Sequence, residues 1–217
     1  MSIVRRAGTL STVHPTSTPT DVEPPTSDGR TSRRERNRAA VVAAMVELID
    51  EGVLDVTMER AAERAGVSVR SVFRYFDSVD DLRRRTVEQH LAHVDARLRH
   101  LDPSDHDRRT RIAALVDDRL DMFEATTGAA RVARRRAEFL PIVAEHLERV
   151  RHRLHDHVLA QLGPELSTLT PARAADLAAT IDVLVSRAGW EALHEVHGRD
   201  RRQVRRMWIA AVDALLP

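Results

Sequence analysis

Side chains suited to contact a nucleic acid gather between Val67 and Phe76. Those with the relevant chemistry are Ser68, Arg70, Ser71, Arg74 and Tyr75, and the segment holds no acidic residue. Arginine can make a bidentate contact to guanine in the major groove, and serine or tyrosine hydroxyls can hydrogen-bond to phosphate oxygens. The composition of this segment therefore predicts a helix that reads DNA.

The residues just before it predict that this helix is the second of a hinged pair. Residues 57–76 read as two short helical stretches joined at Ala65-Gly66-Val67, which is the spacing of a helix-turn-helix. Thr57 and Ser68 can cap the two helices, and Gly66 can adopt the positive φ that the turn needs. The side chains expected to pack between the helices are Ala61, Ala62, Ala65, Val67, Val72 and Phe76.

A basic arm precedes this pair. Residues 30–38 carry a net charge of +4, from one glutamate and the five arginines Arg30, Arg33, Arg34, Arg36 and Arg38. Such an arm can bind phosphates or enter a minor groove, and Arg33 and Arg34 are our candidates for this role. The alternative is that the arginines form a solvated helix face. Their position beside a helix-turn-helix favours the DNA-binding interpretation.

The remaining elements are also predicted to be helices. Ser32 and Glu35 form a capping-box pattern, and an apolar stripe at helical spacing follows as far as Gly52, so the first helix should span about 32–51. Later helices are expected at about 105–126, 129–139, 141–162, 171–196 and 199–216, with Gly163-Pro164 as one of the breaks. No segment alternates with the period of a strand. The predicted fold class is all-α.

The chain divides into three parts on composition. Of residues 9–27, 13 are Ser, Thr or Pro, so residues 1–30 are expected to be a disordered tail. Residues 31–78 should form the helix-turn-helix DNA-binding domain, and residues 79–217 a larger helical domain. No secretory signal and no run long and apolar enough to span a bilayer is evident, so we expect no membrane partner and a cytoplasmic location.

Several kinds of chemistry are excluded by residues that the chain lacks. It contains no cysteine, and all 34 basic residues are arginine, so thiolate and lysine chemistry cannot occur. Three histidine pairs have i, i+3 spacing, namely His90/His93, His152/His155 and His194/His197, but a metal site needs a third converging ligand. We therefore expect no metal, no cofactor and no enzymatic activity.

Taken together, these motifs resemble one family. Residues 32–82 are similar to the DNA-binding domain of the TetR family of bacterial transcriptional regulators. The matching parts are Gly52, Thr57, Ala65-Gly66-Val67-Ser68, Phe73-Arg74-Tyr75-Phe76 and Leu82. Carried over by position, the family's DNA contacts fall on Thr57, Ser68, Arg70, Ser71, Phe73 and Tyr75. Phe73 stands where a tyrosine commonly binds a phosphate, and Val79 where a lysine commonly does, so those two backbone contacts should be missing.

The resemblance also implies a function for the larger domain. It implies a ligand-binding and dimerisation domain, and a homodimeric repressor that an unknown small-molecule effector releases from a palindromic double-stranded DNA operator. The pocket candidates, chosen by residue type, are Met122, Phe123, Phe139, His155 and Trp190. Ordinary core packing is the alternative for each of them.

Two long helices near the C-terminus are the candidates for the dimer interface. Their apolar bands are Leu177, Ile181, Leu184, Val185, Ala188 and Leu193, and Trp208, Ile209, Val212, Leu215 and Leu216. Either band can instead be interior core. The competing function for the whole chain is a helical protein that binds a protein partner without specific DNA recognition.

Overall fold

The computed structural model describes residues 27–53 and 56–217, with side chains from Thr31 onward, and every regular element among them is a helix. The predicted all-α fold class is therefore confirmed. The helices are α1 (Ser27–Asp50), α2 (Met58–Arg64), α3 (Val69–Tyr75), α4 (Val79–Asp95), α5 (Arg108–Ala125), α6 (Thr127–Ala137), α7 (Pro141–Leu166), α8 (Pro171–Leu184), α9 (Arg187–Glu191), the π-helical turn η1 (Ala192–Val196) and α10 (Arg201–Leu215).

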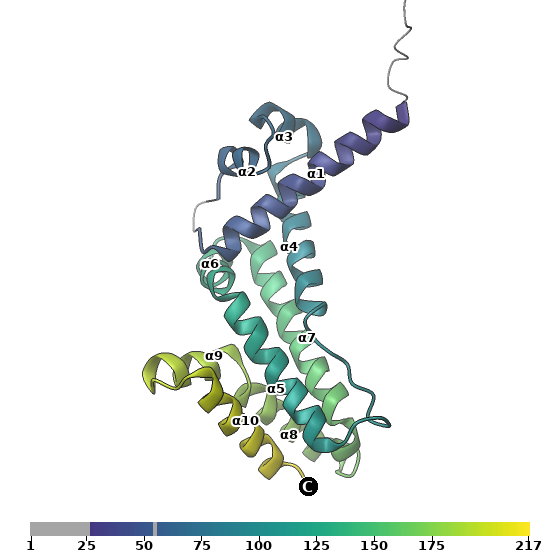
Figure 1. Cartoon of the computed structure of the whole chain (residues 1–217), viewed down its shortest axis with the longest axis vertical. Helices are drawn as coiled ribbons and strands as arrows, with labels where there is room; N and C mark the ends of the chain where they lie inside the picture. The colour runs from purple at the N-terminus through teal and green to yellow at the C-terminus, as the bar shows by residue number, and fades with distance from the viewer. Residues whose placement is uncertain (1–26, 54–55) are drawn as a thin grey trace, which may run out of the picture.

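The molecule is elongated, with the short helices α2 and α3 at one end (Figure 1). Helices α2 and α3 lie beside α1 at the top of the view, and α8 and α10 lie at the opposite end. Helices α4, α5 and α7 run between the two ends. Helix α4 directly follows α3, so it is the covalent link between the helix-turn-helix and the rest of the molecule.

A small core holds α1, α2 and α3 together. Its buried side chains are Val41, Val42, Met45, Ala61, Ala62, Val72, Tyr75, Phe76 and Leu82. The last of these, Leu82, belongs to α4 and lies beyond the predicted domain boundary at residue 78. The first turn of α4 therefore packs as part of the small domain.

The main core lies between α4, α5, α7, α8 and α10. Among its fully buried side chains are Leu115, Leu120, Phe123, Val158, Leu162, Ile181, Val204, Trp208 and Val212. At the surface, ion pairs join α5 to α10: Arg201 binds Asp121 and Glu124 at 2.5 and 2.6 Å, and Arg205 binds Asp117 at 2.6 Å. Most side chains of the predicted C-terminal apolar bands belong to the main core or pack against it.

Two helices have boundaries that differ from the prediction. Helix α1 begins at Ser27 rather than near residue 32, so the predicted boundary between tail and domain falls inside a helix. The rest of the predicted tail, residues 1–26, lies outside the described residues. Helix α7 continues through Gly163-Pro164 to Leu166, where a break was predicted. Leu166 lies one turn after the buried Leu162 and is itself buried. This apolar packing keeps the helix continuous, although Pro164 has no backbone N–H to donate.

The predicted helix 171–196 is divided near its middle. Helix α8 ends at Leu184, and Ser186 caps the start of α9 by accepting a hydrogen bond of 3.1 Å from the Gly189 amide. A Cβ at position 189 would lie 2.5 Å from the carbonyl oxygen of Leu184, so only glycine permits this close turn. Within residues 27–53 and 56–217, none of the helices combines the length and the apolar character needed to cross a membrane.

Candidate nucleic-acid interface

Local signals set the geometry of the helix-turn-helix. The Thr57 hydroxyl accepts a hydrogen bond from the Arg60 amide at 3.3 Å at the start of α2, and the Ser68 hydroxyl accepts one from the Ser71 amide at 3.2 Å at the start of α3. Gly66 has a φ of 67°, in the left-handed region that favours glycine. The two caps and the glycine turn are therefore as predicted.

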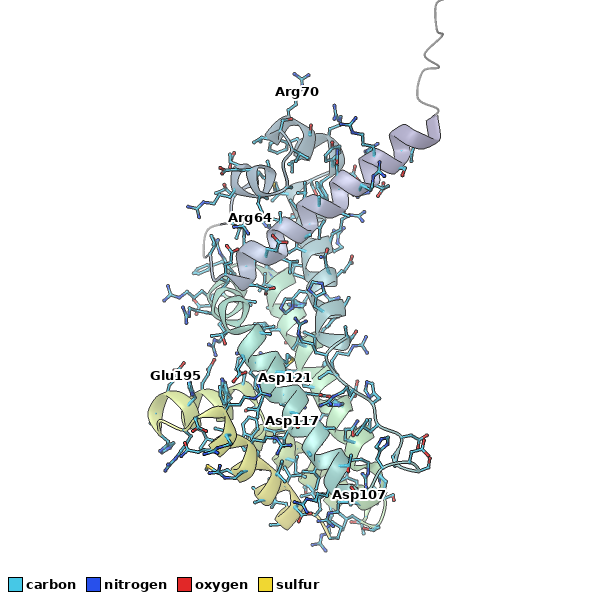
Figure 2. The ribbon with its side chains drawn as sticks, viewed as in Figure 1. Arg64, Arg70, Asp107, Asp117, Asp121 and Glu195 are labelled. Atoms are coloured by element: carbon cyan, nitrogen blue, oxygen red, sulfur yellow. The ribbon has the colours of Figure 1, made fainter. Side chains whose placement is uncertain are left out.

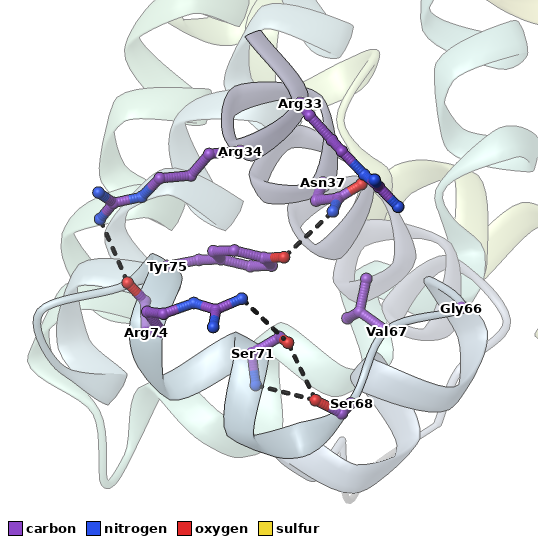
Figure 3. Close-up of a pocket in the computed structure, with 9 residues that line it drawn as sticks. All are labelled: Arg33, Arg34, Asn37, Gly66, Val67, Ser68, Ser71, Arg74 and Tyr75. Atoms are coloured by element: carbon purple, nitrogen blue, oxygen red, sulfur yellow. Dashed lines mark hydrogen bonds between the residues drawn. The ribbon is translucent and has the colours of Figure 1, made fainter. Parts of the chain in front are cut away.

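A groove of about 580 Å³ lies between α1 and α3, and we call it the α1–α3 groove (Figure 3). Its lining residues are Arg33, Arg34, Asn37, Gly66, Val67, Ser68, Ser71, Arg74 and Tyr75. Three of these carry a guanidinium and none carries a carboxylate. The arm from α1 and the helix predicted to read DNA thus form one positively charged surface.

Hydrogen bonds organise the groove from both sides. Ser68 and Ser71 share a bond between their hydroxyls at 2.9 Å, and an Nη atom of Arg74 lies 3.5 Å from the Ser71 hydroxyl. On the other side, the Arg34 guanidinium donates to the carbonyl oxygen of Arg74 at 3.2 Å. These contacts fix the arm against α3, so a phosphate in the groove would meet arginines that are already in place.

The position of the Tyr75 side chain differs from the prediction. We expected its side chain on the exposed face of α3, but only 6% of the residue is exposed, and its ring belongs to the small core. The hydroxyl reaches the groove and accepts a hydrogen bond of 3.1 Å from Asn37. This bond, with help from the Arg74 guanidinium, holds the pKa of Tyr75 below its ordinary value. Only the hydroxyl can therefore meet a ligand.

Three predicted contact residues lie outside the groove. Arg70 extends away from the body at the tip of α3 (Figure 2). Phe73 follows it by one turn on the same helix and is 62% exposed. Thr57 lies at the start of α2, where its hydroxyl serves as the cap. The predicted residues thus lie in three places: the groove, the start of α2, and an outward face of α3 that Arg70 and Phe73 share.

One arginine of the arm has a different role. Arg38 donates to Asp81 at 3.2 Å, and its guanidinium lies 5.4 Å from the centre of the Phe76 ring. Asp81 also accepts from Arg85 at 3.1 Å. Arg38 therefore joins α1 to α4 instead of facing outward. Sequence reasoning missed both this ion pair and the groove residue Asn37, because their partners lie about 40 residues away along the chain.

The candidate pocket residues of the larger domain do not converge on one site. Met122, Phe123 and Trp190 are buried in the main core, while His155 lies near Asp182, 3.8 Å from its carboxylate. Phe139 is 77% exposed. A second hollow of about 400 Å³ lies between α5 and α10, and none of the five lines it. Residue type alone did not indicate which side chains face inward.

Buried polar groups mark two further places in the larger domain. His90 and His146 share a hydrogen bond of 3.0 Å between α4 and α7, and burial lowers the pKa of each to about 4. Asp118, His157 and Gln161 bind Arg99 and thereby hold the loop between α4 and α5. Among the residues that the structure describes, no three histidine or acidic side chains are arranged to hold a metal ion.

The helix-turn-helix region also matches a known family in sequence. Residues 40–86 match the family model described as "Bacterial regulatory proteins, tetR family". This range contains α2, α3, the C-terminal part of α1 and the first half of α4. No sequence among the curated proteins matches the chain.

Solved structures share the fold over most of the chain. A tetR-family transcriptional regulator from Streptomyces coelicolor has 16% identity and a TM-score of 0.68, covering 83% of this chain and 80% of that chain. A TetR transcription regulator from Haloarcula marismortui has 18% identity and a TM-score of 0.58, covering 86% and 100%. The multidrug binding protein EbrR, complexed with imidazole, has 14% identity and a TM-score of 0.52, covering 85% and 95%. At these identities the similarity concerns the fold.

Proposed function

We propose that this chain, whose residues 40–86 match the family model of bacterial tetR regulators, is a homodimeric repressor that a small ligand releases from a palindromic operator. The α1–α3 groove is the observation that carries the proposal. It presents Arg33, Arg34 and Arg74 with no carboxylate among its lining residues, and Arg70 projects beside it. A phosphate backbone in the groove would leave Arg70 in the major groove to contact bases.

Exposed apolar side chains support the homodimer. Beyond α7, four large apolar side chains are exposed, namely Val183, Val196, Met207 and Leu215. They lie on α8, η1 and α10, at the end of the molecule opposite the helix-turn-helix. A two-fold contact there would bury them and leave both groove-bearing ends free to meet half-sites about 34 Å apart.

Two contacts supply a route from the larger domain to the groove. Helix α4 contributes Leu82 to the small core and Val94 to the main core. A shift of α4 would therefore move side chains in both cores. The backbones of α1 and α6 are in contact at the end of α1. A Cβ atom added at Gly128 of α6 would lie only 2.0 Å from the carbonyl oxygen of Asp50. A ligand that binds the larger domain and displaces α4 or α6 would change the spacing of the two recognition helices and lower the DNA affinity.

The test begins with selection of binding sites from a random duplex library by the full chain. We expect a palindromic motif. Fluorescence anisotropy with that duplex should show binding that survives excess random DNA. Arg70→Ala should weaken this specific binding, whereas Arg151→Ala, which changes an exposed arginine on α7, should leave it unchanged. Sedimentation should show two chains per duplex, and a small-molecule screen should find compounds that release it. Selection that returns no motif would overturn the proposal.

The competing function is a helical protein that binds a protein partner and uses α2 and α3 only as structure. Such a protein would bind duplexes through its arginines without regard to sequence, and random competitor would abolish that binding. The alignment of basic groups along a groove with no acidic lining favours the DNA-binding function.

A further inference from the structure

Phe73 is an aromatic side chain that the small core does not use. Helix α3 buries Val72, Tyr75 and Phe76 against α1 and α2, whereas Phe73 is 62% exposed. A single exposed apolar residue is common on proteins, so exposure alone says little. Its position on α3 is more informative, because Phe73 lies one helical turn after Arg70, whose side chain points away from the body (Figure 2).

The chemistry of the ring narrows what it can contact on DNA. Phenylalanine has no donor or acceptor, so it cannot hydrogen-bond to a phosphate or to a base edge. Within the major groove, the exposed apolar group is the C5-methyl of thymine. Three residues advance about 4.5 Å along a helix, and neighbouring base pairs are about 3.4 Å apart, so the ring lies within about two base pairs of the Arg70 contact.

We propose that Phe73 recognises a thymine through its methyl group, beside a guanine that Arg70 contacts. The operator half-site then contains guanine and thymine within about two base pairs of each other. This assignment rests on the proposed function, because it requires the chain to bind a specific duplex. A ring that instead lies against deoxyribose would strengthen binding to all sequences equally.

Base analogues test the assignment directly. In the operator obtained by selection, each thymine of the half-site is replaced in turn by deoxyuridine, which lacks only the methyl group. For the native chain we expect one position, repeated in the other half-site, where the loss of the methyl weakens binding about three- to fivefold. Replacing that thymine by 5-methylcytosine should give tighter binding than replacing it by cytosine, since the methyl group is retained.

Two variants tie the effect to the ring. Phe73→Ala should bind more weakly and lose its response to deoxyuridine at that position, whereas Phe73→Leu, which keeps an apolar side chain, should retain part of the response. Arg70→Ala serves as the matched control and should still respond to the methyl group. Because Phe73 is exposed, circular dichroism should show unchanged folding in both Phe73 variants; if Phe73→Ala unfolds, Phe73→Leu decides.

The possible outcomes distinguish the role of Phe73 from the proposed function of the whole chain. Specific binding by the native chain with no response to deoxyuridine at any thymine would overturn the role of Phe73 and leave the proposed function intact. A response that persists in Phe73→Ala would overturn it as well. Failure of the selection to return any motif would overturn the proposed function itself.

Discussion

The side-chain amide of Asn37 donates a hydrogen bond of 3.1 Å to the hydroxyl of Tyr75, joining α1 to α3 across 38 residues of chain. Both residues line the α1–α3 groove. The Tyr75 ring packs in the small core, so its hydroxyl has a fixed position, and the bond fixes the amide beside it. The spacing between the basic arm and α3 therefore depends on a polar contact as well as on apolar packing.

Removing either partner of this bond should lower stability. We expect Tyr75→Phe and Asn37→Ala each to lower the free energy of unfolding by about 1 kcal/mol, because a part-buried group loses its partner. The double variant should cost less than the sum, with a coupling of about 0.5–1.5 kcal/mol. Urea unfolding of the four proteins measures the cycle. Additive losses would mean that the bond contributes nothing to stability.

Arginines on the outward face and in the arm should differ in their effect on DNA binding. Arg70→Ala should reduce discrimination between operator and random duplex by about 1–3 kcal/mol, because it removes a base contact. Arg33→Ala should weaken both duplexes alike and reduce the slope of log affinity against log salt by about one. Anisotropy titrations at several salt concentrations measure both quantities. Equal loss on both duplexes in Arg70→Ala would contradict the base-reading role.

The fully buried Arg119 should respond asymmetrically to loss of each partner. Its guanidinium donates to the Leu154 carbonyl and, at 3.1 Å, to Asp182, whose side chain is 27% exposed. Burial lowers the pKa of Arg119 to about 10, so it stays charged at neutral pH. Asp182→Ala should cost about 3 kcal/mol because it leaves that charge buried without its hydrogen-bonded counter-charge. Arg119→Met should cost less than about 1 kcal/mol, because water can hydrate Asp182.

Urea midpoints measure this asymmetry. The matched controls are Arg205→Met and Asp117→Ala, which break a more exposed ion pair between α10 and α5 and should each cost at most about 1 kcal/mol. If Arg119→Met destabilises the protein as much as Asp182→Ala does, the guanidinium is itself a main source of stability, and the expected asymmetry is wrong.

Features set by neighbouring residues could be predicted from the sequence, and features set by distant ones could not. The caps at Thr57 and Ser68 and the turn at Gly66 depend on a few adjacent residues, and each was predicted correctly. The burial of Tyr75 depends on α1, which packs against α3 from far along the chain. An aromatic residue near the end of a short helix carries no local sign of which face it occupies.

Tertiary packing also explains the errors in the larger domain. Gly163-Pro164 is a strong local signal for a break, yet the burial of Leu166 keeps α7 intact beyond it. Residue type selected both Phe123, which is buried against Trp208, and Phe139, which lies at the surface. Phe123 lies on α5, whereas Phe139 lies in the turn between α6 and α7, and the sequence alone does not show which distant side chains each one meets.

A buried histidine predicts how stability depends on pH. His157 is fully buried, its Nε2 lies 2.9 Å from the Arg99 carbonyl oxygen, and burial lowers its pKa to about 4. Between pH 6.5 and about 4 the unfolded chain binds a proton that the folded chain does not. Stability contributed by the neutral ring is therefore complete above pH 6.5 and falls as the pH drops toward 4.

The variant His157→Gln isolates this effect, because glutamine can keep a donor near the Arg99 carbonyl and does not titrate. We expect the difference in unfolding free energy between the native chain and His157→Gln to shift by at most about 3 kcal/mol from pH 7 to pH 4, in favour of the variant at low pH. Urea unfolding across this range measures it, and carboxylates common to both proteins cancel. His152→Gln, at an exposed position of the same helix, controls for loss of a histidine as such. A difference that is constant with pH would mean that His157 binds its proton equally in the folded and unfolded chains.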